Sequence, residues 1–189
     1  AGRQGGRAGA GLAGLPARRC LEKTTGTLSM TPSLNWDYPE PHTVALKVLP
    51  EHIDVMRHTN NVVYQQWMEA AAWSHSQANG LGPADYEACG HGMVVRRHEL
   101  DYLAASHLGE ELLIGTWLLS VDKLSTHRVY QIIRLGDGLT IFRGATHLVC
   151  IEIASGRLKR MPPHFYETYS RLVTVRTNTH STNTTEETA

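Results

Sequence analysis

A chain of 189 residues is long enough for one ordinary domain and too short for two of average size. Hydrophobic residues make up 41% of it and charged residues 19%, a globular composition that excludes a wholly disordered chain. The 18 basic and 18 acidic side chains cancel to a net charge of zero, so the chain lacks the positive field of a nucleic-acid-binding protein.

Membrane and secretory features are not found in the sequence. No apolar run approaches the roughly 18 to 20 residues that a membrane span requires, and no charged-then-apolar signal sequence opens the chain. Cys20, Cys89 and Cys150 lie far apart without a Cys-x-x-Cys pair, which argues against a disulfide framework or a zinc site. These features predict a cytoplasmic protein without a membrane partner.

The two ends of the chain differ in composition from its middle. Residues 1–33 are rich in Gly, Ala and Arg with no sustained apolar period, which predicts a disordered extension. The Arg-rich, acid-poor character is also that of an organelle transit peptide, and a third interpretation places the natural start at Met30. Residues 176–189, rich in Thr, Asn and Glu, are predicted to be a disordered tail.

A single domain is predicted over residues 34–175. Apolar residues alternate over 43–49, which predicts a strand that ends before Pro50. The Ala-rich stretch 61–79 predicts a long helix stopped by Gly80. Its apolar residues fall on more than one stripe, so we expect a central helix buried on much of its circumference.

Four strand-like runs follow the helix, and turn residues separate them. The runs are 93–103, 112–121, 128–135 and 139–153. Their breaks contain Gly109, Gly136–Gly138 and Gly156, which predicts an antiparallel meander, and a short helix is expected over 162–173. The order of elements predicts an α+β domain in which a curved antiparallel sheet of about five strands wraps around the long helix.

The most informative stretch is 54–69, with the sequence DVMRHTNNVVYQQWME. It places a carboxylate, an imidazole and two amides directly before the start of the predicted helix. Unpaired backbone N–H groups and the helix dipole favour negative charge at such an end. The stretch therefore predicts an oxyanion hole beside a carboxylate.

This stretch resembles the hotdog-fold thioesterases of the 4-hydroxybenzoyl-CoA thioesterase type. Their motif is an Asp, a loop that often ends in His-x-Asn-Asn, and an aromatic-bearing central helix; the loop is also similar to that of plant acyl-carrier-protein thioesterases. Residues 99–112 resemble the family's second and third strands joined by a tight turn. The resemblance covers roughly residues 43–173 and implies a single hotdog domain, acyl-CoA hydrolysis to free acid and CoA, and a homodimer or tetramer.

The resemblance also implies roles for residues of the loop. Asp54 is implied as nucleophile or general base, and the backbone N–H of Asn61 as the group that holds the thioester oxygen. His58 either binds substrate or orients the loop, and Asn60 is expected to cap the helix. A structural interpretation of Asp54 also exists, because Asp is common in turns before helices.

Two positions depart from the family pattern, and one helix carboxylate competes with Asp54. Arg57 stands where family members commonly have Gly, and Met56 replaces an Asn of the plant enzymes, so their catalytic network is not transferred. Glu69 lies on the helix, where a second group of hotdog thioesterases uses a glutamate. Its spacing from Asp54 favours a structural carboxylate, and Glu99 is given no catalytic role.

The remaining site predictions concern the pocket and CoA. Tyr64, Trp67 and Met68 are expected in the core or the acyl pocket wall. The hydroxyls and the cation of a segment at the start of a strand suit a phosphate or pantetheine, with a solvated turn as the equal alternative. These residues are Ser125, Thr126 and Arg128.

Thioester hydrolysis requires neither a metal nor a cofactor, and none is predicted, because no His/Glu metal motif occurs in the sequence. Two further functions remain open: a non-catalytic acyl-CoA or lipid-binding hotdog protein, and an acyl-carrier-protein thioesterase. The identity of the acyl group is not predicted.

Overall fold

The computed structural model describes residues 34–174. Its elements in chain order are β1 (His42–Lys47), the 3-10 helix η1 (Pro50–His52), α1 (Asn61–Ala78), α2 (Pro83–Cys89), β2 (His91–Tyr102), β3 (Glu111–Val121), β4 (Ser125–Arg134), β5 (Thr140–Glu152) and α3 (Pro163–Arg171). The segments 1–33 and 176–189, predicted to be disordered, lie outside the described residues, so the limits of the predicted domain stay predictions.

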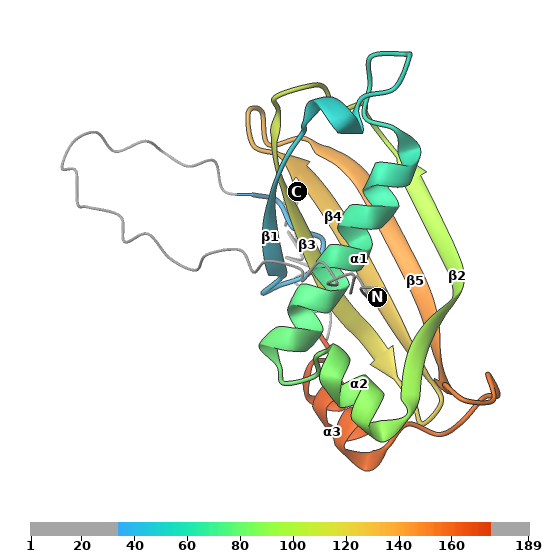
Figure 1. Ribbon diagram of the computed structural model, residues 1–189. Coiled ribbons are helices and arrows are strands. Elements are labelled where there is room, and N and C mark those ends of the chain that lie inside the picture. Colours follow the sequence, from blue (N-terminus) through green and yellow to red (C-terminus); the bar gives the residue numbers. More distant parts are fainter. Residues whose placement is uncertain (1–33, 175–189) are drawn as a thin grey trace, which may run out of the picture. The chain divides into compact units, whose positions relative to one another are not determined.

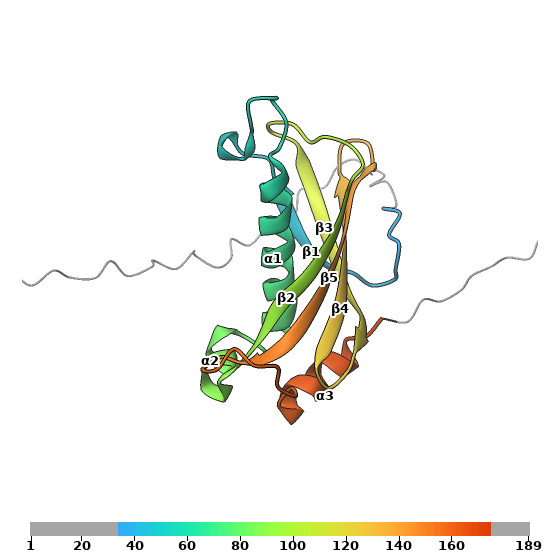
Figure 2. The ribbon, with the colours of Figure 1, turned by 90° about the vertical axis from the view of Figure 1, so that its right-hand side faces the viewer.

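The five strands form one antiparallel sheet in the order β1-β3-β4-β5-β2. Helix α1 lies across this sheet, and the side view shows it on one face only (Figures 1 and 2). Helices α2 and α3 lie at the end of the sheet remote from the N-terminus of α1. The α+β fold with a five-stranded sheet around a long helix is therefore confirmed.

The prediction that the last four strands form a meander is wrong at β2. Strands β3, β4 and β5 are consecutive neighbours, but β2 pairs with β5, from His91 opposite Glu152 to Tyr102 opposite Phe142. A tight turn from β2 to β3 is excluded because β1 and β4 already occupy both sides of β3. The chain instead crosses the end of the sheet through residues 103–110, a segment that we call the crossover.

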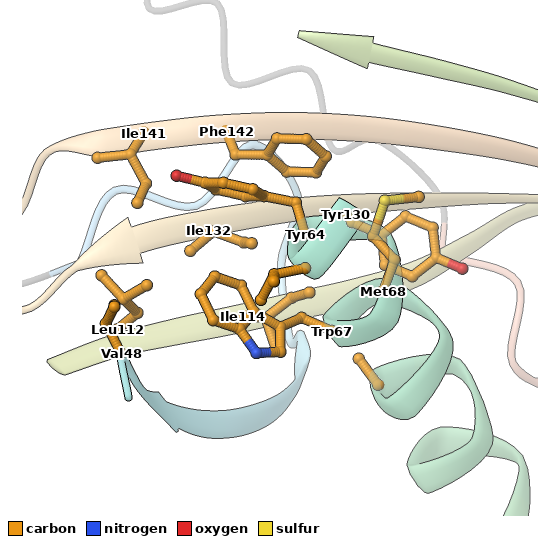
Figure 3. Packing of buried hydrophobic residues seen from close by; sticks show 12 residues of the cluster. Val48, Tyr64, Trp67, Met68, Leu112, Ile114, Tyr130, Ile132, Ile141 and Phe142 are labelled. Carbon is orange, nitrogen blue, oxygen red and sulfur yellow. The ribbon is translucent and has the colours of Figure 1, made fainter. Parts of the chain in front are cut away.

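Helix α1 buries a single stripe, not much of its circumference as predicted. The buried residues recur at three- and four-residue spacing and face the sheet core of Ile114, Ile132 and Phe142 (Figure 3). They include Val63, Tyr64, Trp67, Met68 and Ala71. Val62, which lies beside this stripe, is 58% exposed. Each large side chain in the stripe contributes about 1.5–3 kcal/mol of burial.

The opposite face of the sheet is covered by the segment that precedes β1, drawn in blue in Figure 2. Trp36 packs edge-on against Trp117 of β3, and the Trp117 indole N–H donates to the Pro39 carbonyl at 2.8 Å. This approach is close because β3 has Gly115 beneath the ring: an added Cβ would lie 2.7 Å from Trp36 Cζ3. The glycine is therefore required by packing, since its backbone φ is not in the left-handed region.

We expect Gly115→Ala to lower the free energy of unfolding by about 1–3 kcal/mol, because the added methyl overlaps ring atoms of Trp36, Pro41 and Trp117 that have little room to move. Denaturant unfolding followed by tryptophan fluorescence measures this change. Gly92→Ala is the matched control, because its nearest contact, Ile153 Cγ1 at 3.5 Å, is an ordinary one. Equal stability of the two variants would contradict the packing argument.

Candidate active site

The loop between η1 and α1 is held by its own backbone. The Asp54 N–H donates to the His58 carbonyl at 2.9 Å, and the Arg57 N–H donates to the Asp54 carbonyl at 3.0 Å. Both backbone groups of Asp54 are therefore satisfied inside the loop. The position of its side chain is fixed by a closed turn and not by a flexible linker.

Arg57 adopts a left-handed backbone, with φ of 63°. A non-glycine residue in this region costs roughly 1–2 kcal/mol relative to the usual conformations. This explains why related loops favour glycine before the histidine, which was the departure noted at this position. The loop retains the glycine-type conformation although the residue is an arginine.

The half-buried Asp54 carboxylate uses one oxygen to hold the loop. Its Oδ1 accepts from the Met56 N–H at 2.8 Å, which is an Asx turn. Within residues 34–174, the second oxygen accepts no hydrogen bond and pairs with no cation. The carboxylate is thus oriented through one oxygen, while the other is available for chemistry.

The backbone N–H of Asn61 lies at the start of α1, where the helix itself provides no acceptor. Asn60 has an extended backbone and its Oδ1 accepts from the Val62 N–H at 2.9 Å, so the predicted N-cap is confirmed. The Asn60 N–H donates to the His52 carbonyl, and the Val63 N–H to the Asn60 carbonyl. In the described part of the chain the N–H of Asn61 therefore has no partner. This is the donor that was predicted to hold the thioester oxygen.

The imidazole of His58 contacts a second histidine and not the carboxylate of Asp54. Its ring meets that of His107 edge-on, with 5.1 Å between centroids. His107 belongs to the crossover, and its Nδ1 lies 3.4 Å from the Arg57 carbonyl. Among the described residues no hydrogen bond links His58 to Asp54 except the backbone one, so the His58 ring lies against the crossover and not against the Asp54 carboxylate.

A buried hydroxyl cluster fastens the loop to the crossover. The Thr59 N–H and hydroxyl both donate to the Ser106 carbonyl, at 2.9 and 3.2 Å. The Ser106 hydroxyl donates back to Thr59 Oγ1 at 2.7 Å, which leaves Tyr64 to donate to Ser106 Oγ at 2.9 Å. Sequence reasoning missed Ser106, because a serine between two strands shows no sign that it will be fully buried.

A cavity of about 390 Å³ runs along α1 on the side that faces β2, β4 and β5. Its walls are mostly apolar and begin at Val62, next to the helix start. Tyr64, Trp67 and Met68 lie in the core, as predicted, and Met68 also lines the cavity. Glu69 also lines this cavity from its exposed position on the helix.

The three residues predicted for CoA divide between two environments. The Ser125 hydroxyl donates to Asp122 Oδ2 at 2.7 Å in the turn before β4. Thr126 and Arg128 are each only 3% exposed and line the cavity, so Arg128 is not the solvated charge of a turn. The alternation of β4 turns these two side chains toward α1.

His75 at the C-terminal end of α1 is neutral. Burial, with the Arg128 guanidinium and His42 beside it, lowers its pKa to about 3. The neutral ring can accept from Arg128 Nη1, which lies 3.0 Å from His75 Nδ1. Over residues 34–174, no group of His, Cys, Asp and Glu is arranged to hold a metal ion, and no helix is long and apolar enough to cross a membrane.

Comparisons with known proteins agree with this fold. Residues 48–168, which include the loop, α1 and strands β2 to β5, match the Thioesterase-like superfamily. The chain belongs to this superfamily. It is a thioester hydrolase with the hotdog fold.

Individual relatives of this thioesterase are distant. A protein of Synechocystis sp. (strain PCC 6803) whose name proposes an esterase is 27% identical over 121 residues, 64% of this chain and 73% of that protein. The crystal structure of a 1,4-dihydroxy-2-naphthoyl-CoA thioesterase from Synechocystis has a TM-score of 0.64 at 18% identity, covering 70% of this chain and 98% of that one. A hypothetical protein of Staphylococcus aureus solved in complex with CoA has a TM-score of 0.67 at 17% identity, covering 76% and 92%. The two solved structures show the shared fold.

We expect Ser106→Ala to destabilise the thioesterase by about 1–3 kcal/mol, because the hydroxyls of Thr59 and Tyr64 lose a partner in a buried site. Turnover should fall with it, since the loop that presents Asp54 loosens. Denaturant unfolding and a thioester assay measure the two effects. Ser120→Ala, an exposed change on β3, is the control and should be nearly neutral; an equally small effect at Ser106 would contradict the anchoring role.

Proposed function

We propose that this thioesterase hydrolyses an acyl-CoA to the free acid and CoA, with Asp54 as the catalytic carboxylate. The observation that supports this most is a pairing within one short loop. Asp54 keeps one carboxylate oxygen without a partner, and Asn61, at the end of the same loop, keeps its N–H without an acceptor. A carboxylate and an oxyanion donor are the two groups that thioester hydrolysis requires.

The chemistry follows from the weakness of the thioester bond. Its carbonyl lacks much of the resonance protection of an amide, so attack at carbon needs no serine triad and no metal. Asp54 either attacks the carbonyl to give a mixed anhydride that water then cleaves, or removes a proton from the attacking water. In both routes the Asn61 N–H and the dipole of α1 stabilise the oxyanion, and the products are a carboxylic acid and the CoA thiol.

His58 is proposed as a group that orients the loop and contacts the substrate. Its edge-on contact with His107 and the hydrogen bond from Asp54 to its carbonyl support positioning over direct base catalysis. The Staphylococcus aureus neighbour with bound CoA supports a CoA thioester as substrate. The assignment of Ser125, Thr126 and Arg128 to CoA stays a prediction, and the burial of the latter two favours contact with the acyl part.

We expect Asp54→Asn to lower hydrolysis at least about a hundredfold while acyl-CoA binding is retained. Asparagine can still accept the Met56 N–H bond through its amide oxygen, so the loop should keep its shape, and only the charge is lost. Thiol release from acyl-CoAs of several classes, with acyl-carrier-protein thioesters alongside, measures turnover and the preferred carrier.

Glu69→Gln is the matched control for Asp54→Asn, because it removes the carboxylate that lies on the helix and lines the cavity. Its turnover should stay near that of the wild type. Normal turnover of Asp54→Asn, or a selective loss in Glu69→Gln with its fold intact, would move the catalytic carboxylate onto the helix. Binding without any hydrolysis by the wild type would favour the non-catalytic alternative.

We also propose that two copies of the chain pair through β2. This strand has 12 residues and lies at the edge of the sheet, with its outer backbone groups free to pair. Val94 and Val95 on it are 37% and 51% exposed. The other edge, β1, has only six residues and offers a shorter template.

Light scattering should therefore give a mass of at least a dimer. Val94→Lys should shift the equilibrium toward the monomer, because a charge on an edge strand opposes pairing. Ser170→Lys, on the exposed side of α3, is the control and should leave the mass unchanged. A strictly monomeric wild type that retains activity would refute the pairing.

A further inference from the structure

The cavity along α1 contains a buried cation. In β4, Thr126, Arg128, Tyr130 and Ile132 alternate onto the side that faces the helix, and Arg128 is only 3% exposed there. Arg128 is among the residues that line the cavity, together with apolar side chains. Arginine keeps its charge under all ordinary conditions, so this charge is buried whether or not an anion is present.

The partners of Arg128 within the protein are neutral. Its Nη1 donates to the His75 ring at 3.0 Å and to the Thr116 hydroxyl at 3.2 Å. His75 stacks on His42, and burial and Arg128 lower the pKa of both rings, so neither histidine adds or removes charge near neutral pH. Over residues 34–174, no carboxylate lies within 4.0 Å of the guanidinium.

A buried charge without a counter-ion is costly, because hydrogen bonds to neutral groups replace only part of its hydration. The partial negative charge at the C-terminal end of α1 offsets part of that cost. A charge kept under these conditions, in a cavity whose walls are mostly apolar, is typical of a group that recognises a ligand.

The distance of Arg128 from the start of α1 determines which part of a substrate Arg128 can contact. His75 lies 14 residues along α1 from Asn61, about 21 Å at the helical rise, so the cation is far from the proposed thioester site. The cavity between them begins at Val62 and is lined mainly by apolar side chains such as Trp73, Met93 and Leu148. These walls suit an acyl chain, whereas the CoA phosphates are strongly hydrated and favour an open surface.

We propose that the thioesterase prefers acyl groups with a carboxylate at the end remote from the thioester, and that Arg128 binds this carboxylate. The inference rests on the proposed function, because it places the thioester carbonyl at the N-terminus of α1. A planar guanidinium matches a carboxylate in geometry and charge. The bound carboxylate supplies the counter-ion that the protein itself lacks around Arg128.

Glu69 is the carboxylate among the residues that line the cavity. It is exposed and lies six residues before His75, about 9 Å along the helix axis. A substrate carboxylate bound at Arg128 therefore lies beyond Glu69. The apolar part of the acyl chain lies alongside Glu69. Replacement of Glu69 by Gln removes this repulsion without changing the cation.

Binding can be measured without hydrolysis by using CoA thioethers, in which a methylene replaces the carbonyl. Two series of increasing chain length, one ending in a methyl and one in a carboxylate, are titrated by calorimetry into the full chain. At the length that reaches Arg128, the carboxylate series should bind wild type at least about tenfold more tightly. Glu69→Gln should keep or increase this preference.

Arg128→Met should fold, because removing an uncompensated buried charge is often neutral or stabilising, and it should lose the preference for the carboxylate. Arg128→Lys, which retains the charge, should keep part of it. Equal affinity of the two series for wild type at every length overturns the proposal, whether or not the variants fold. Equal weakening of both series and of free CoA in Arg128→Met also overturns it, in favour of a phosphate contact.

The two proposals fail in different ways. If the thioethers show the preference but the matching thioesters are not hydrolysed, the proposed function fails and the carboxylate site stands. If thioesters are hydrolysed with no preference for the carboxylate series, the proposed function stands and the role of Arg128 is wrong.

Discussion

The packing of α1 into one face of the sheet is the constraint on which the other features depend. Tyr64 and Met68 fill the space above β5, and Gly144 on that strand permits the close approach, since a Cβ there would lie 3.0 Å from Met68 Sδ. Because a helix is rigid, this packing fixes both of its ends. The N-terminal end presents the Asn61 N–H, and the C-terminal end brings His75 against Arg128.

The loop before α1 needs a second support, because a helix end alone does not orient a carboxylate ahead of it. The crossover supplies this support through Ser106, which joins Thr59 of the loop to Tyr64 of the helix. The unusual position of β2 is what makes this possible. Had β2 and β3 formed a hairpin, no segment would cross the end of the sheet beneath the loop.

Local signals in the sequence were sufficient for α1, for the presence of the five strands and for the loop. Asn60 and Gly80 predicted the two ends of α1, and the structure shows an N-cap at the first and a φ of 79° at the second. The seven-residue helix α2, from Pro83 to Cys89, was not predicted. The partner of β2 could not be predicted, since strand pairing depends on contacts far apart in the chain.

The site shows the same division between local and distant information. The Asp54 loop is a continuous motif and was found, whereas the burial of Ser106 depends on two other segments. Arg128 is an intermediate case: its strand was predicted to start at that residue, but it starts at Ser125. Extending the two-residue alternation back from Ile132 and Tyr130 would have placed Arg128 on the helix-facing side.

Two donor groups at opposite ends of α1 have requirements that the described chain meets only in part or not at all, besides the second carboxylate oxygen of Asp54. One is the N–H of Asn61 at the helix start, and the other is the guanidinium of Arg128 about 21 Å farther along. Asp54 lies before the N-terminal end of α1, too far from Arg128 to be its counter-ion. On the proposed assignment a single substrate satisfies both, because its carbonyl oxygen becomes the acceptor at one end and its carboxylate the anion at the other. The apolar walls between them favour the chain of the substrate by burial, while the two polar ends determine its length and its terminal group.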